Sequence, residues 1–183
     1  MYLSHFGFRE PPFSVTPNPK FLYSNPAYEE AFANLRYGIE GRKGFIVLTG
    51  EVGTGKTTLL RRLMATLHPK TPFVFLFNTR LAFDEILAFV CDELRIAPVP
   101  SLRVQRIQVL NEFLLRQVRE GRTTALLVDE AQNLGDDVLE ELRLLSNLET
   151  NDEKLLQIAL VGQPELDAKL ARQELRQLRQ RIA

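Results

Sequence analysis

The sequence predicts an α/β fold, a three-layer α/β/α sandwich around a parallel sheet. Short, continuous apolar runs alternate along the chain with longer segments whose apolar residues recur at helical spacing. Strands buried on both faces of a parallel sheet are continuous apolar runs, and helices provide the right-handed connections between them. Strands are therefore expected at 44–49, 73–77, 124–128 and 155–161.

The elements follow in order. Residues 1–25 are rich in Pro and Phe, which predicts an arm with little regular structure, packed by its aromatic side chains on a core at 26–183. Ser24-Asn25-Pro26 offers a cap and a first helical Pro, and Gly38 and Gly41 are expected to close that helix. Further helices are expected at 56–67, at 83–94, over 102–118, behind a cap at Asp136 or Asp137, and in the Arg-rich segment after Pro164.

The length and composition suit one globular domain. The 183 residues are 45% hydrophobic, enough for a full core. The formal net charge is zero, which argues against nucleic acid or an anionic membrane as a partner. The single cysteine excludes an internal disulfide. No apolar run approaches the ~20 residues that cross a bilayer. We therefore expect a cytoplasmic segment without membrane contact.

A glycine-rich loop follows the first expected strand. Its sequence, Gly-Glu-Val-Gly-Thr-Gly-Lys-Thr, satisfies G-x-x-x-x-G-K-[ST] at every fixed position. Glycines let backbone N–H groups approach phosphate oxygens, and the helix that follows adds its positive end. Lys56 would reach the β- and γ-phosphates of ATP, and Thr57 would ligate the accompanying Mg²⁺. A chance match in a Gly/Thr-rich turn is the alternative. The predicted nucleotide-binding residues are Gly50, Glu51, Val52, Gly53, Thr54, Gly55, Lys56, Thr57 and Thr58.

A second motif ends the apolar strand at 124–128 with two adjacent carboxylates, Asp129 and Glu130. Because the carboxyl ends of parallel strands open onto one crevice, we expect both side chains beside the phosphate loop. Asp129 would hold Mg²⁺ through its water shell, and Glu130 would orient or deprotonate the attacking water. The pair favours ATP hydrolysis over binding alone. A helix N-cap followed by a first-turn acid is the structural alternative.

Five segments distributed along the whole chain carry a family resemblance: 6–14, 50–58, 128–133, 161–166 and 175–182. Together they resemble the ExeA/GspA family of AAA+ ATPases, which is associated with bacterial general secretion. The resemblance implies a P-loop NTPase with an AAA+ core that binds ATP and Mg²⁺ and forms a homo-oligomer in the full-length protein. It also implies a secretion or envelope partner protein, and a full-length protein that can be anchored to the inner membrane.

The resemblance adds two catalytic residues. Gln163 takes the sensor 1 position, where an amide reads the γ-phosphate or positions the water. Arg181, or else Arg176 or Arg179, takes the place of an arginine finger that reaches the nucleotide of a neighbouring subunit. An ordinary Arg-rich surface helix is the alternative. Residues 25–28 and the arm lie where relatives hold adenine, although the arm could equally be only a lid over the core.

The resemblance also implies parts of the fold beyond residue 183. An AAA+ core has a fifth strand and a helical lid after the arginine helix, and the chain ends at Ala183. We therefore expect a core that is truncated before the fifth strand and the lid, and weak hydrolysis by this segment alone. Two other functions stay open: a DNA-associated AAA+ ATPase of the transposition type, and a nucleotide switch that does not hydrolyse ATP.

Overall fold

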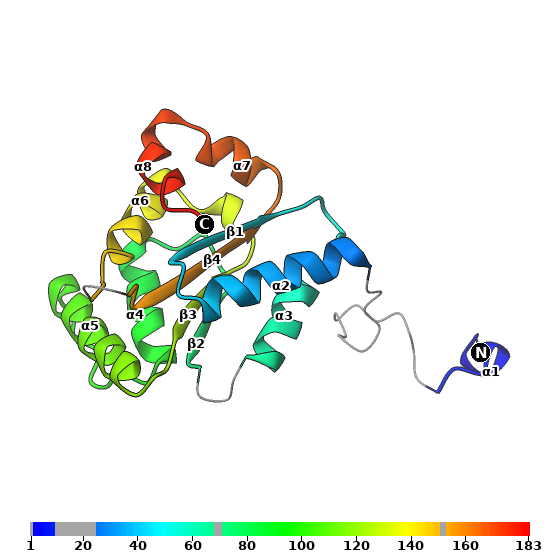
Figure 1. Cartoon of the computed structure of the whole chain (residues 1–183), viewed down its shortest axis with the longest axis horizontal. Coiled ribbons are helices and arrows are strands. Elements are labelled where there is room, and N and C mark those ends of the chain that lie inside the picture. Colours follow the sequence, from blue (N-terminus) through cyan, green and yellow to red (C-terminus); the bar gives the residue numbers. More distant parts are fainter. Residues whose placement is uncertain (1, 10–24, 68–70, 151–152) are drawn as a thin grey trace.

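The computed structural model describes residues 2–9, 25–67, 71–150 and 153–183, and the predicted α/β architecture is confirmed (Figure 1). Its sheet has four parallel strands in the order β1-β4-β3-β2. Each strand boundary lies within one residue of the expected one. The strands are β1 (Phe45–Thr49), β2 (Phe73–Leu76), β3 (Thr124–Val128) and β4 (Leu156–Gly162).

Helices cover both faces of this sheet and make the three layers (Figure 1). One face carries α2 (Pro26–Glu40) and α3 (Lys56–Thr66). The other face carries the helices between β2 and β4, which are α4 (Phe83–Glu93), α5 (Arg103–Arg119) and α6 (Asp136–Leu145). The sequence therefore predicted these five helices correctly, α2 from its capping residues and the others mainly from helical periodicity.

Alternate residues of each strand pack into two separate hydrophobic cores, one on each face of the sheet. In β3, Leu126 and Val128 pack with the α4–α6 layer, whereas Ala125 and Leu127 pack with α2 and α3. Every residue of β3 and β4 is buried. Apart from Thr124 and Gln157, these two central strands carry apolar residues on both faces because neither face meets water.

The N-terminus of α2 is capped as the sequence predicted. The Oδ1 atom of Asn25 accepts a hydrogen bond from the backbone N–H of Tyr28 at 2.8 Å, and Pro26 opens the helix. Gly41 is the C-cap, but Gly38 lies inside the helix and is buried. The predicted cap at Asp136 or Asp137 is wrong, because Gly135 takes the N-cap position of α6 and both acids occupy its first turn.

The two ends of the chain also differ from expectation. A short helix, α1 (Tyr2–Phe6), forms where little regular structure was expected, and it buries none of its residues. Of the predicted aromatic anchors, Phe6 and Phe8 are exposed, and Phe13 and Phe21 lie outside the described residues. The Arg-rich segment breaks because Arg172 is extended, with φ −65° and ψ 152°. Its pieces are α7 (Glu165–Leu170), the 3₁₀ turn η3 (Gln173–Leu175) and α8 (Arg176–Arg179).

The last residues return to the free edge of β1. Ile182 forms a parallel bridge with Phe45, and the backbone N–H of Ala183 donates to the Phe45 carbonyl at 3.0 Å. Both sides of Phe45 therefore carry backbone partners, since Ile158 of β4 is its partner on the other side.

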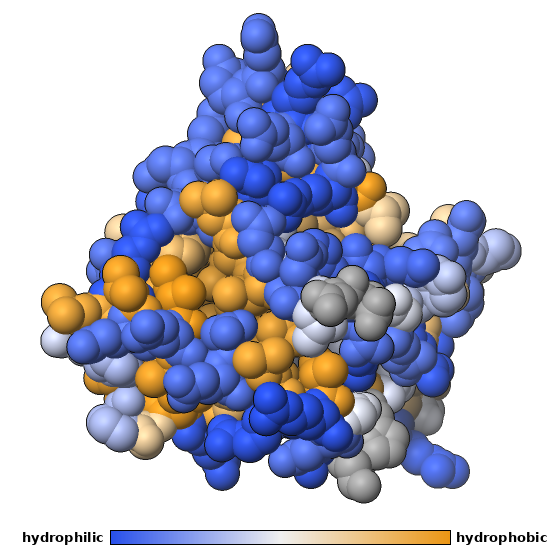
Figure 2. Space-filling view, turned by 60° about the vertical axis from the view of Figure 1, so that its left-hand side comes forward, coloured by the Kyte–Doolittle hydropathy of each residue, from blue (hydrophilic) through white to orange (hydrophobic). Residues whose placement is uncertain are grey.

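Apolar side chains are also exposed on the layer of α4, α5 and α6. Figure 2 turns the α5 side of the molecule forward and shows apolar atoms across the middle of that face. The large exposed apolar residues of this layer are Leu102, Val104 and Leu144, from the N-cap of α5, α5 itself and α6.

Candidate nucleotide-binding site

The phosphate loop joins β1 to α3 and is open to solvent. Gly53 and Gly55 have φ of 81° and 86°, a conformation that glycine adopts without a Cβ penalty. The hydroxyl of Thr54 closes the turn by donating to the Glu51 carbonyl at 2.8 Å. The predicted loop residues 51–54 are all exposed. Backbone N–H groups at the start of α3 therefore face a space that an anion can enter.

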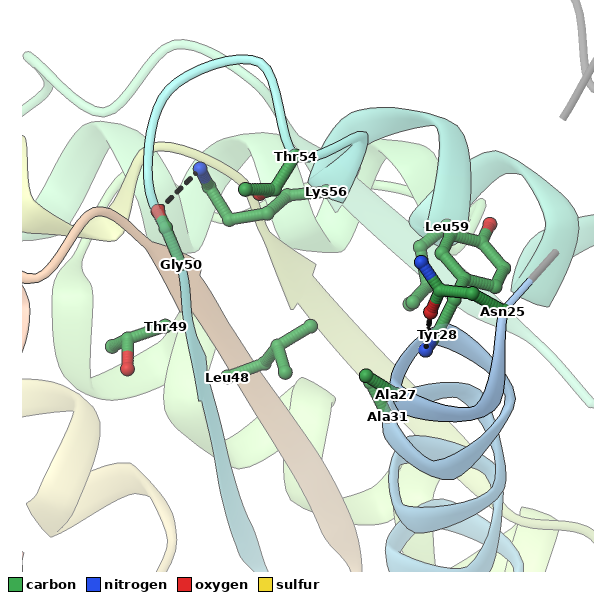
Figure 3. A pocket seen from close by; sticks show the side chains of 10 residues that line it. All are labelled: Asn25, Ala27, Tyr28, Ala31, Leu48, Thr49, Gly50, Thr54, Lys56 and Leu59. Atoms are coloured by element: carbon green, nitrogen blue, oxygen red, sulfur yellow. Dashed lines mark hydrogen bonds between the residues drawn. The ribbon is translucent and has the colours of Figure 1, made fainter. Parts of the chain in front are cut away.

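Lys56 curls back over this loop. Its ammonium donates to the carbonyls of Gly50 at 2.7 Å and Glu51 at 2.9 Å, and Figure 3 shows the first of these bonds. These contacts hold the positive charge at the mouth of the loop. A phosphate bound there would meet a cation that is already in place.

The two predicted metal ligands meet. The hydroxyl of Thr57, in the first turn of α3, donates to Oδ2 of Asp129 at 2.7 Å, although 72 residues separate them in the chain. Asp129 follows β3 and is only 5% exposed. In the described residues, no group of three or more His, Cys, Asp or Glu could hold a metal ion. A pair of oxygen ligands suits Mg²⁺, which keeps several waters and takes further oxygens from phosphates.

Glu130 stands next to this pair in an unusual backbone conformation. Its φ of 51° and ψ of 40° are left-handed, which is uncommon for a residue with a side chain and is found at functional sites. Oε2 of its carboxylate accepts from Nε2 of Gln163 at 3.2 Å. The structure thus brings the predicted base and the predicted sensor into contact, at the ends of β3 and β4.

A cavity of about 340 Å³ lies between the phosphate loop and α2. Figure 3 shows Leu48 of β1 on one side and Ala27 and Ala31 of α2 on the other, with Lys56 and Thr54 above. Apolar walls next to a phosphate loop suit the flat face of a nucleobase. Asn25, Ala27 and Tyr28, from the segment 25–28 that was expected beside adenine, line this cavity.

A cluster around Arg62 sets the position of α2 against α3. The guanidinium forms two hydrogen bonds with the Glu29 carboxylate, at 2.7 and 3.1 Å, and lies 4.3 Å from the centre of the Phe32 ring. Its proximity to an aromatic face adds a cation–π attraction. The helix that walls the cavity is therefore tied to the helix that begins with Lys56.

The predicted arginine finger does not join this group. Arg181 donates to the Ser146 hydroxyl at 3.2 Å and to Oδ1 of Asn147, both at the C-terminal end of α6. Arg176 and Arg179, the other candidates, are exposed. Arg181 is thus engaged within its own chain, whereas the two alternatives present their side chains to solvent.

Two residues without a predicted role contact the site. The Gln132 amide bonds to the Glu130 carboxylate and to the backbone N–H of Gln163. The ammonium of Lys169 donates to the backbone carbonyls of Gln132 at 2.7 Å and Leu134 at 2.5 Å. Gln132 lay inside a segment that carried the family resemblance, so its position in the motif was the available signal. Lys169 gave no signal in the sequence.

A known protein family matches most of the chain, including most of the candidate site. Residues 39–170 match the AAA domain family. The chain belongs to this family. The matched range includes the phosphate loop, Asp129, Glu130 and Gln163.

The resemblance to the ExeA/GspA family is confirmed. The chain is 46% identical, over its full 183 residues, to General secretion pathway protein A of Aeromonas hydrophila. It spans 34% of the length of that relative. No helix in the described ranges is long and apolar enough to cross a membrane.

Solved AAA+ structures share the fold. Cdc6p from Pyrobaculum aerophilum has a TM-score of 0.63 and 20% identity, with 90% of this chain and 47% of that chain covered. The ORC2 protein of Aeropyrum pernix, solved as ADPNP–ADP complexes, has a TM-score of 0.59 and 17% identity, with 94% and 49% covered. At such identities the likeness concerns the fold alone.

Proposed function

We propose that this AAA-domain chain binds ATP with Mg²⁺ and hydrolyses it. The observation that carries the proposal is the 2.7 Å hydrogen bond between Thr57 and Asp129 beneath an open phosphate loop. Thr57 would ligate Mg²⁺ through its hydroxyl oxygen, and Asp129 would hold the ion through its water shell. The Lys56 ammonium would exchange its hydrogen bonds to the loop carbonyls for hydrogen bonds to phosphate oxygens. A relative in fold was solved with ADPNP and ADP, which supports the same class of ligand.

Hydrolysis is assigned to the residues at the ends of β3 and β4. Glu130 would orient or deprotonate the attacking water, and Gln163, which shares a hydrogen bond with it, would contact the γ-phosphate. Positioning and electrostatic stabilisation account for most of phosphoryl-transfer catalysis.

The proposed physiological role follows from the relative that matches the whole chain. We infer that the parent protein assembles into a homo-oligomer in the cytoplasm and uses ATP turnover to assemble or remodel an envelope secretion system. The 46% identity to a general secretion pathway protein supports this role. An arginine from the segment 176–181 would complete the site of a neighbouring subunit.

Calorimetry with Mg-ATP and a phosphate-release assay test the chemistry. Lys56→Ala removes charged hydrogen bonds worth ~1.5–3 kcal/mol each, so the Kd for ATP should rise by about 100-fold or more. Glu130→Gln should keep the Kd within about twofold and lower kcat by ~10²–10⁴. Arg119→Ala, an exposed change on α5, is the control and should alter neither value.

The outcomes separate the alternatives. Equal loss of binding in Lys56→Ala and Glu130→Gln would contradict the two roles assigned. Tight ATP binding without phosphate release in the unmutated protein would favour the non-hydrolysing switch. Turnover that rises with duplex DNA and loses that rise as salt is added would favour the DNA-associated ATPase.

A further inference from the structure

The side chain of Gln132 forms hydrogen bonds with the residues proposed to carry out hydrolysis. Gln132 is the middle residue of the 3₁₀ turn η2 (Ala131–Asn133), which begins directly after Glu130. Its Nε2 donates to Oε2 of Glu130 at 2.5 Å, and its Oε1 accepts from the backbone N–H of Gln163 at 3.0 Å. One partly buried amide therefore links the residues that follow β3 to the residue that follows β4.

The surroundings fix this amide. Lys169 holds the η2 backbone through the Gln132 carbonyl. On the other side, a Cβ added at Gly162 would lie 2.6 Å from Oε1 of Gln132, so the amide fills space that only a glycine leaves open. The Gly162 carbonyl in turn accepts from the N–H of Gly50, the first residue of the phosphate loop, at 3.1 Å.

These contacts form a continuous connection from the phosphate loop, through the end of β4, to the Glu130 carboxylate. We propose that Gln132 is a positioning residue for hydrolysis, which aims Glu130 and couples its carboxylate to the residues that hold phosphate. The proposal rests on the proposed ATPase function. It assigns Gln132 no contact with the nucleotide.

The hydrogen-bonding capacity of the groups supports the assignment. An ionised carboxylate only accepts hydrogen bonds, and both amide donors, Gln132 and Gln163, bond to the same oxygen of Glu130. In the part of the chain that the structure describes, both of these donors leave Oε1 of Glu130 available to accept a hydrogen bond from water. Two bonds on one oxygen restrict rotation of the carboxylate, and an error of about 1 Å in such a group costs ~100-fold in rate.

The first test is Gln132→Ala, with Asn133→Ala as the matched control in the same turn. Asn133 is exposed. Gln132→Ala should lower kcat for phosphate release at least tenfold, while the Kd for Mg-ATP and the midpoint of urea unfolding stay near those of Asn133→Ala. A merely structural role would instead weaken binding and stability together. That pattern, or a kcat within twofold of the parent or above it, overturns the proposal.

The second test asks whether Gln132 acts through Glu130. Gln132→Glu keeps the shape and an acceptor for the Gln163 N–H but removes the donor to Glu130, so its kcat should fall at least as far as in Gln132→Ala. In Glu130→Gln, adding Gln132→Ala should cause no further loss, because residues that act as a unit are non-additive. An additional tenfold loss in the double variant would show an independent role.

Two outcomes distinguish the failure of the Gln132 proposal from the failure of the proposed ATPase function. If the unmutated protein shows no phosphate release that Lys56→Ala abolishes, the ATPase function and the role of Gln132 are overturned together. If Glu130→Gln abolishes release and Gln132→Ala leaves it unchanged, the ATPase function stands and the positioning role alone is refuted.

Discussion

Gly38 of α2 gives a stability prediction that runs opposite to the usual rule. Replacing an interior helix glycine by alanine normally stabilises by about 0.5–1 kcal/mol, because glycine loses more backbone entropy on folding. Here the new Cβ would lie 2.4 Å from Cγ1 of Ile46 in β1, more than 1 Å inside normal carbon contact. Ile46 is β-branched and buried, so it cannot rotate away freely.

The magnitude follows from the two opposing effects. Overpacking a buried contact costs about 1–3 kcal/mol, which exceeds the helix gain and leaves Gly38→Ala about 1 kcal/mol less stable than the parent. Ile46→Ala removes the clashing atom but costs about 2–5 kcal/mol by itself. In the Ile46→Ala background, Gly38→Ala should become stabilising, so the two changes should be coupled by about 2 kcal/mol.

Urea unfolding of the four proteins in this cycle measures the coupling directly. Asn34→Ala, an exposed change in the middle of the same helix, is the control and should stabilise by a few tenths of a kcal/mol through helix propensity alone. If Gly38→Ala in the parent stabilises as much as an ordinary helix glycine would, the close approach of α2 to β1 is refuted.

Three further predictions concern the site and the core. Thr57→Ala and Asp129→Asn should each weaken ATP binding mainly when Mg²⁺ is present, and an equal effect in EDTA would argue against a metal pair. Mixing Arg181→Ala with Glu130→Gln subunits of the full-length protein should restore part of the turnover, because the intact Glu130 of one subunit can meet the intact Arg181 of its neighbour. Repeating the mixture with Arg176→Ala and with Arg179→Ala identifies the finger. If none of the three mixtures restores turnover, action in trans is excluded. Burial raises the pKa of the Cys91 thiol, so a thiol reagent should label the folded protein only as it unfolds, and rapid labelling at neutral pH would show the core around α4 to be open.

Much of the fold follows from patterns that the sequence displays. The strands were predictable because burial on both faces makes their residues apolar without alternation, as Leu126 and Leu127 show. The phosphate loop and the Asp129–Glu130 pair were predictable because their chemistry requires fixed residue types. Topology then brought Thr57 and Asp129 together, since both follow the carboxyl ends of parallel strands.

The remaining differences arise from tertiary contacts that a linear pattern does not contain. Gly38 was expected to end a helix, yet it lies inside α2, where the close approach of Ile46 leaves room only for a hydrogen atom. Asp136 and Asp137 were expected as caps, although Gly135 takes that position with extended backbone angles. Gln132 received no role because its importance depends on a contact with Gln163, 31 residues further along the chain.

The pairing of the last residues with β1 has a practical consequence for protein engineering. Ala183 is held by its own backbone N–H to the carbonyl of Phe45, at the start of the strand that leads to the phosphate loop. A purification tag or fluorescent fusion joined directly to this residue would begin beside the edge of that strand. Reporter modules are better attached ahead of Tyr2, where α1 buries none of its side chains.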